Sequence, residues 1–114
     1  MTFETKIGSP TVFHLQGAAL GGPDGLAFSS ALSEVLAGGS TTILIDLSGV
    51  ELMNSSGLGM LVAASRDVLS SQGVLALCRA NDKILELMAM TRLDSVFKLF
   101  GSQEEAVKVL SANN

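Results

Sequence analysis

Short apolar segments and longer stretches with helical spacing alternate along most of this chain. Five segments rich in β-branched, aromatic and aliphatic residues predict strands. They are residues 2–8, 11–16, 41–47, 74–78 and 97–100. The third, TTILIDL, is almost continuously apolar or β-branched, which is typical of a strand buried on both faces of a parallel sheet.

Stretches with apolar residues three and four positions apart predict helices. They are residues 26–36, 56–71 and 82–90, followed by a last helix that holds Ala106, Val107 and Leu110. Gly38 and Gly73 indicate where the first two helices end. Ser102 and Glu105 have the spacing of a capping box at the start of the last helix, and residues 17–25 predict a loop.

Two strands precede a regular alternation of helix and strand, which predicts an α/β fold. We expect a mixed central β-sheet with helices packed against it, joined mostly by right-handed crossovers. The chain has 114 residues, of which 47% are hydrophobic. This length and composition suit a single domain over residues 1–114.

Charge and composition exclude several classes of function. The net charge is −4 with the charges scattered, so no basic stripe exists for a nucleic acid. The longest apolar run, near residues 58–65, is far shorter than the about 20 residues needed to cross a bilayer. The first ten residues lack the pattern of a signal peptide, so we expect a cytoplasmic protein without membrane insertion. Cys78 is the only cysteine, which excludes an internal disulfide and predicts a core residue.

Residues 54–62, NSSGLGMLV, place two hydroxyls and two glycines at the start of a helix. Asn54 or Ser55 can cap this helix, and Gly57 and Gly59 leave the backbone of its first turns open. One hydroxyl then remains beside a helix N-terminus, which is a natural anion site. The segment lacks the lysine of a P-loop, and neither serine has the glycine that a nucleophile elbow requires two positions earlier.

Nothing else in the sequence forms a catalytic constellation. The single histidine, His14, lies in mid-strand and is expected to be structural. Asp46 and Glu51 flank the turn after the third strand without forming an obvious acid–base pair. We therefore expect no catalytic residues, no metal site and no cofactor.

The helix over residues 56–71 carries two stripes of side chains. The first should lie on the sheet, and its members are Leu58, Leu61, Val62, Ser65, Val68 and Leu69. The second consists of Ser56, Met60, Ala63 and Asp67. It either packs against the helix around Leu85 and Met88 or forms a contact surface for another protein.

The segment ILIDLSGVELMNSSGLGMLV, residues 43–62, resembles the signature of STAS domains, above all those of bacterial anti-sigma factor antagonists. In that family a buried strand ends in Asp-Leu-Ser, and Asp-Ser-Ser-Gly-Leu-Gly then opens a helix. The resemblance continues through residues 73–107 and covers nearly the whole chain. It implies a single STAS domain.

The resemblance also implies a phosphorylation switch. An antagonist of this family binds an anti-sigma factor that is a serine kinase, and so releases a sigma factor. The kinase phosphorylates the first serine of the motif, here Ser55, the complex dissociates, and a phosphatase restores binding. Asn54, Ser56 and Gly57 would cap the helix or adjoin the phosphosite. The residues implied to bind the partner are Ser56, Gly59, Met60, Ala63 and Asp24.

The chain departs from the family pattern at three places. Asn54 stands where most antagonists have aspartate, residues 17–20 read GAAL in place of Gly-Glu-Leu-Asp, and Arg92 replaces a glycine. The first two departures remove negative charge from the surroundings of the acceptor serine. They favour an alternative, a STAS interaction subunit of an ABC-type lipid transporter or signalling scaffold that is not phosphorylated. Ser55 would then only cap its helix, and the oligomeric state is left open.

Overall fold

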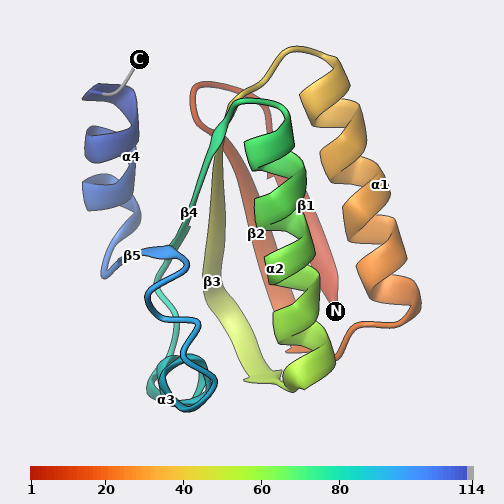
Figure 1. The fold of residues 1–114 in the computed structure, drawn as a ribbon, viewed down its shortest axis with the longest axis vertical. Coiled ribbons are helices and arrows are strands. Elements are labelled where there is room, and N and C mark those ends of the chain that lie inside the picture. The colour runs from red at the N-terminus through yellow and green to blue at the C-terminus, as the bar shows by residue number, and fades with distance from the viewer. Residues whose placement is uncertain (113–114) are drawn as a thin grey trace.

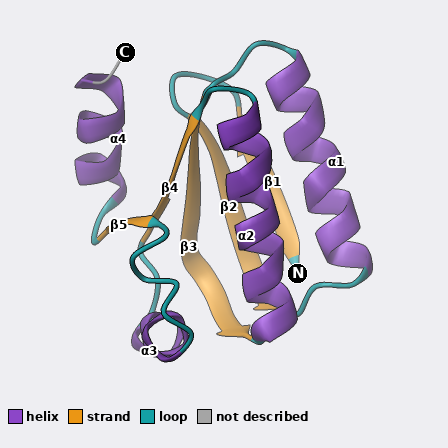
Figure 2. Cartoon of the chain, viewed as in Figure 1, coloured by secondary structure: helices purple, strands orange, loops and turns teal. Residues whose placement is uncertain are grey.

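The computed structural model describes residues 1–112, and within them five strands form one mixed sheet (Figures 1 and 2). The strands are β1 (Thr2–Lys6), β2 (Thr11–Ala19), β3 (Thr42–Met53), β4 (Val74–Cys78) and β5 (Lys98–Phe100). They lie side by side in chain order, with β1 antiparallel to β2 and every other pair parallel. This arrangement confirms the α/β fold with a mixed sheet that the sequence predicts.

The helices divide between the two faces of the sheet. They are α1 (Pro23–Ala37), α2 (Ser55–Ser70), α3 (Asp82–Met90) and α4 (Gln103–Ala112). Figure 1 shows α1 and α2 running alongside each other over one face, whereas α4 lies apart from them beyond β4. No helix within the described residues is both long enough and apolar enough to cross a membrane.

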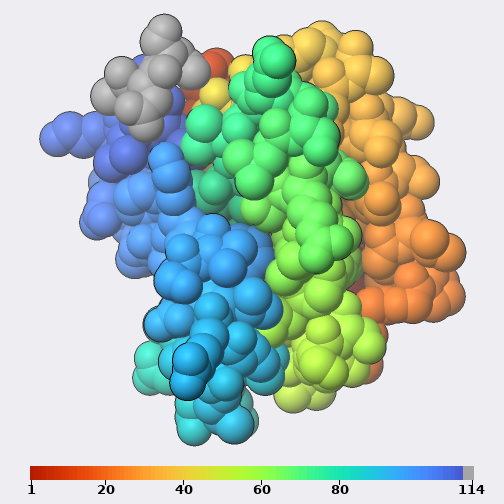
Figure 3. Space-filling view, viewed as in Figure 1, coloured from red at the N-terminus to blue at the C-terminus, as the bar shows by residue number. Residues whose placement is uncertain are grey.

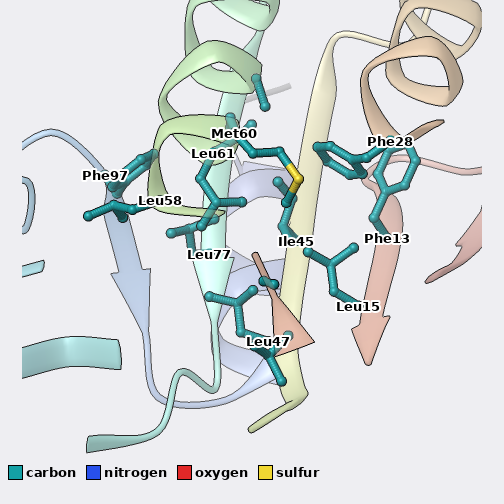
Figure 4. Close-up of a cluster of buried hydrophobic side chains, with 14 of the residues drawn as sticks. Phe13, Leu15, Phe28, Ile45, Leu47, Leu58, Met60, Leu61, Leu77 and Phe97 are labelled. Carbon is teal, nitrogen blue, oxygen red and sulfur yellow. The ribbon is translucent and has the colours of Figure 1, made fainter. Parts of the chain in front are cut away.

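Alternation along the strands supplies two cores, one on each face of the sheet. Phe13 and Leu15 of β2 point toward α1 and α2, where they join the larger cluster (Figure 4). Val12, between Thr11 and Phe13, points to the other face and packs with residues of α4. Members of the smaller cluster are Val12, Leu44, Ala76, Cys78, Ala106 and Leu110. Cys78 is therefore a core residue, as predicted.

Three boundaries differ most from those expected from the sequence, the ends of β2 and β3 and the start of α1. Strand β2 continues through Ala19 and β3 through Met53, so part of the predicted loop over residues 17–25 is strand. The two extensions pair with each other in parallel, Ala19 opposite Met53. Because glycine and alanine have weak strand propensity, only this long-range pairing reveals the extension. Helix α1 begins at Pro23, whose fixed φ suits the first helical position.

Of the five leucines and valines in the predicted sheet-facing stripe of α2, three are buried, Val62 is partly buried against the core, and one is exposed. Leu58, Leu61 and Val68 are buried, but Leu69 is 66% exposed. Ala64 takes the remaining place on the buried face. Leu69 is exposed because it lies about 100° around the helix axis from Val68, so its side chain points away from the sheet.

A pair of substitutions on α2 tests this assignment. We expect Leu61→Ala to lower the free energy of unfolding by about 3–4 kcal/mol, because it leaves a cavity under the helix. Leu69→Ala, the matched control on the same helix, should change it by less than about 0.5 kcal/mol. Urea unfolding followed by circular dichroism measures both, and equal losses would refute the orientation of α2.

Candidate functional site

The site is built at the junction where β2 and β3 end and α2 begins. Ala18 pairs with Leu52 and Ala19 with Met53, which brings the ends of the two strands to the same edge of the sheet. The backbone N–H of Asn54 then donates to the carbonyl oxygen of Ala19 at 3.4 Å. The first residue of α2, Ser55, therefore follows directly from a fixed strand end.

Gly57 allows the first turn of α2 to lie against the end of β2. A Cβ at Gly57 would collide with the carbonyl oxygen of Ala19, and it would stand 2.7 Å from the carbonyl carbon. Gly21, in the loop between β2 and α1, is also in close contact with α2, because a Cβ there would lie 2.9 Å from the Cβ of Ser56. These two glycines let two backbones approach more closely than side chains would permit.

Asn54 caps α2, which leaves the hydroxyl of Ser55 uncommitted. The Asn54 Oδ1 accepts a hydrogen bond from the backbone N–H of Gly57 at 2.8 Å. Ser55 is exposed and its hydroxyl makes no hydrogen bond within the described residues. Of the two caps that the sequence left open, the structure uses Asn54, so Ser55 is not required as a cap.

A second asparagine fixes the other side of the junction. Asn81 caps α3 by accepting from the backbone N–H of Ile84 at 2.9 Å. Its Nδ2 donates to the carbonyl oxygens of Val50 at 3.1 Å and Glu51 at 3.4 Å. The end of β3 is thereby tied to α3 a few residues before Ser55. Sequence reasoning missed this contact, because nothing local to Asn81 indicates that β3 lies beside it.

The residues predicted to bind a partner differ in how accessible they are. Ser56, Gly59 and Ala63 are exposed, and a Cβ at Gly59 would meet nothing within 4 Å. Met60 is largely buried at 9% exposure. Asp24 is partly exposed and its Oδ2 lies 2.9 Å from the amino group of Met1. The structure thus brings four of the five residues to α2 and places Asp24 across from them in the first turn of α1.

The second stripe of α2 faces α1, which corrects one of the two alternatives drawn from the sequence. Ser56, Met60, Ala63 and Asp67 line a hollow together with residues of α1 and the loop before it. The alternative in which this stripe packs against the helix around Leu85 and Met88 is therefore wrong. The crossover through β4 and the turn after it carries α3 away from α2, to the end of the sheet (Figure 1).

Two leucines near the ends of β2 and β3 were not singled out from the sequence. Leu20 follows the last residue of β2 and is 45% exposed, and Leu52 is the second-last residue of β3 and is 55% exposed. The sequence placed Leu20 in the predicted loop over residues 17–25 and Leu52 outside the predicted strands, and it gave no sign of the strand ends that lie there. They leave exposed apolar side chains close to the ends of β2 and β3.

A polar cluster lies on the opposite face of the sheet, at Asp46. Its carboxylate is fully buried and accepts hydrogen bonds from Arg79, with Nε at 3.2 Å and Nη2 as a second donor. His14 Nδ1 lies 2.9 Å from Asp46 Oδ2, and the backbone N–H of Ser48 donates to Oδ1 at 2.9 Å. The sequence predicted a turn between Asp46 and Glu51, which is wrong, because β3 runs on to Met53.

These contacts shift the pKa of two groups in the cluster. Burial alone would raise the pKa of Asp46, but the hydrogen bonds from Arg79 and Ser48 and the charge of Arg79 outweigh it and hold the pKa below its usual range. Burial, helped by the negative charge of Asp46, raises the pKa of the Cys78 thiol to about 11. At neutral pH the carboxylate is therefore ionised and the thiol is protonated.

The role of this cluster is structural. His14 pairs with Asp46, and within the described residues neither Ser55 nor Ser56 contacts His14. The described residues also contain no group of three histidine, cysteine or acidic side chains placed to hold a metal ion. The chemistry that the junction itself offers is an exposed hydroxyl beside the positive end of a helix dipole.

Alanine at two glycines of α2 tests the close contact of the junction. Gly57→Ala should lower the free energy of unfolding by about 2–3 kcal/mol, because its Cβ would collide with the backbone of β2. Gly59→Ala should raise it by about 0.5–1 kcal/mol, because its Cβ enters open space and alanine favours the helix. Thermal and urea unfolding measure both changes, and a loss for Gly59→Ala as large as that for Gly57→Ala would contradict this packing.

Substitution of Asp46 tests the polar cluster and its pH dependence. Asp46→Asn should cost about 2–3 kcal/mol at pH 7, below the range for a fully buried pair because Arg79 is 41% exposed. Because the folded pKa is lowered from 3.8, the contribution of Asp46 is complete above about pH 4 and is lost as the pH falls through the folded pKa. The parent should therefore lose more stability between pH 4 and pH 2 than Asp46→Asn does.

Asp94→Asn is the matched control, since Asp94 is exposed and makes no ion pair within the described residues. It should resemble the parent at pH 7 and on acidification. Urea unfolding at a series of pH values decides the matter, and a parent-like acid response of Asp46→Asn would remove the role given to the cluster.

Comparison with known proteins bears on the family and the fold. A family model described as "Mlab, STAS domain" matches residues 4–100. The anti-sigma-F factor antagonist RsfB of Mycobacterium tuberculosis is 36% identical over 83 residues, which cover 71% of this chain and 66% of that relative. The protein TM1081 of Thermotoga maritima, solved by NMR, is 27% identical with a TM-score of 0.79, and the match covers 97% of this chain and 90% of that one.

The fold is shared more widely still. The phosphorylated form of the Bacillus cell fate determinant SpoIIAA superimposes with a TM-score of 0.75 at 19% identity, covering 96% of this chain and 99% of that one. The aligned stretch spans about two thirds of the length of the curated relatives. From the family match over most of its length, the chain belongs to the STAS domain family.

Proposed function

We propose that this chain is an anti-sigma factor antagonist that is switched off by phosphorylation of Ser55. It binds an anti-sigma factor that is also a serine kinase, and this binding releases a sigma factor. The kinase transfers phosphate from ATP to Ser55, which dissociates the complex, and a phosphatase restores binding. The chain itself acts as a regulatory binding protein and not as an enzyme.

The observation that carries this proposal is that Asn54, and not Ser55, caps α2. Asn54 supplies the cap of α2, and Ser55 presents an exposed hydroxyl with no partner among the described residues. A serine with only a capping role would make the hydrogen bond that Asn54 makes. The relatives named as anti-sigma factor antagonists support the same function.

The electrostatics of α2 suit a phosphate at its start. Helices α1, α3 and α4 each have an acidic residue in the first turn, whereas α2 has none. The positive end of its dipole is therefore not yet matched by a side chain. A phosphate of roughly −1.5 to −2 charges should be tolerated there, with a gain of about 0.3–1 kcal/mol in folding free energy.

The same charge should be costly inside an interface. A hundredfold loss of affinity corresponds to about 2.8 kcal/mol. Leaving one charge buried and unpaired costs about 3–5 kcal/mol, which is sufficient. A partner that covers the exposed Ser55 would have to desolvate the phosphate, and that cost opposes binding.

The exposed side chains of Leu20 and Leu52 favour a second candidate function. A STAS subunit that is never phosphorylated, in an ABC-type lipid transporter or a signalling scaffold, would bind its partner through a permanently apolar surface. Asn54 in place of an acidic residue fits this candidate as well. The two functions differ in whether Ser55 accepts phosphate, which is measurable directly.

Phosphorylation by the purified anti-sigma factor kinases of the source organism tests the proposal. With ATP, mass spectrometry should find one phosphate at Ser55 in the parent and in Ser56→Ala, and none in Ser55→Ala. The Ser56→Ala variant is the control for damage to the helix start. Equal phosphorylation of Ser55→Ala would show that the site is misassigned, and no phosphorylation of the parent would favour the second candidate function.

Acidic substitution separates binding from folding. Ser55→Asp and Ser55→Glu should weaken binding of the kinase at least tenfold while leaving the melting temperature close to that of the parent. Ser30→Asp on α1, where Ser30 is exposed, adds the same charge away from the junction and should bind like the parent. Titration calorimetry and melting curves give both readouts, and tight binding by both acidic variants would place Ser55 outside the interface.

A further inference from the structure

Two hollows lie between α1 and α2, on the face of the molecule seen in Figure 3. Asp67 lines both of them. The hollow nearer the start of α2 has a volume of about 220 Å³, and the other has about 380 Å³. We call the first hollow the α1–α2 groove.

The groove is apolar and open to solvent at its rim. Phe28, Leu32 and Met60 form its buried floor. Leu26, which is 73% exposed, and Ala63 stand at its rim. Its volume is below the roughly 300–1,000 Å³ typical of small-molecule pockets. The groove therefore fits a side chain of another protein better than a cofactor.

One charge marks the far end of the groove. Among the described residues that line either hollow, Asp67 alone carries an ionisable side chain. It is exposed and forms no ion pair within residues 1–112. A partner that places an apolar side chain in the groove would gain by setting a lysine or arginine beside Asp67.

The groove is continuous with the surface that carries Ser55. Ser56 lines the groove at its other end, directly next to the acceptor serine. With a rise of about 1.5 Å per residue, Asp67 lies about 18 Å along the helix from Ser55. A single short partner segment along α2 therefore spans both places.

We propose that the α1–α2 groove is the docking site for a segment of the partner anti-sigma factor that carries an apolar side chain and, close to it, a lysine or arginine. This inference rests on the proposed function. The apolar side chain fills the groove over Met60, and the cation pairs with Asp67. The groove selects which partner docks, whereas phosphate at Ser55 determines whether the docked partner stays bound.

Two substitutions and their matched controls test the docking site. Ala63→Phe fills the groove and Asp67→Lys reverses its charge, and each should weaken binding of the purified kinase at least tenfold by titration calorimetry. Ser30→Phe adds an exposed ring on α1 outside the groove. Glu34→Lys makes the same change of net charge at an exposed site that lines neither hollow. Both controls should bind within threefold of the parent.

Salt dependence and phosphorylation complete the test. The affinity of the parent should fall as salt rises, and Asp67→Asn should reduce that dependence. If both groove variants fold, as melting curves report, and bind like the parent, the docking site is refuted, while Ser55 phosphorylation of the parent would leave the proposed function intact. If the parent binds none of the kinases, both proposals fall.

A second copy of this chain is the competing occupant of the α1–α2 groove. Sedimentation equilibrium of the chain alone should show the same oligomeric state for the parent and Ala63→Phe. A dimer of the parent that Ala63→Phe dissociates would assign the groove to a second copy of this chain and overturn the proposal.

Discussion

The close contact between Gly57 and the carbonyl of Ala19 is the constraint on which the rest of the site depends. It seats the first turn of α2 on the end of β2, and the hydrogen bond from Asn54 to the same carbonyl holds the turn in register. The parallel pairing of Ala19 with Met53 brings the two strand ends together. A larger residue at position 57 would lift the helix start, and with it Ser55, away from the sheet.

This arrangement separates the proposed phosphorylation site from the contacts that hold the fold. Asn54 satisfies the helix start, and Asn81 fixes the end of β3 against α3. Ser55 is then attached to a rigid junction, but it contributes no hydrogen bond to it within the described residues. A charge added to its hydroxyl acts on whatever approaches the surface, and the dipole of α2 compensates that charge within the fold. Under the proposed function, stability and partner binding are thereby governed by different atoms.

The sequence predicted the order of strands and helices, the mixed sheet and the helix start at Asn54 and Ser55, because each depends on local spacing and capping residues. It could not predict contacts that join distant segments. His14 and Asp46 gave no local signal of their pairing, which follows from the parallel register of β2 and β3. The partner helix of Met60 and Ala63 was likewise undetermined, since the spacing of a stripe says which residues share a face and not what covers it.

The central claim is that modification of Ser55 changes the surface and leaves the fold intact. The most direct measurement is the amide NMR spectrum of the chain carrying phosphoserine at position 55, compared with that of the parent. Shifts confined to residues near the junction, roughly 19–22 and 52–60, with the sheet amides of β1 and β4 unchanged, would agree with the account. Shifts spread through β3 and β4, or a marked loss of dispersion, would mean that the phosphate acts by disturbing the fold and would contradict it.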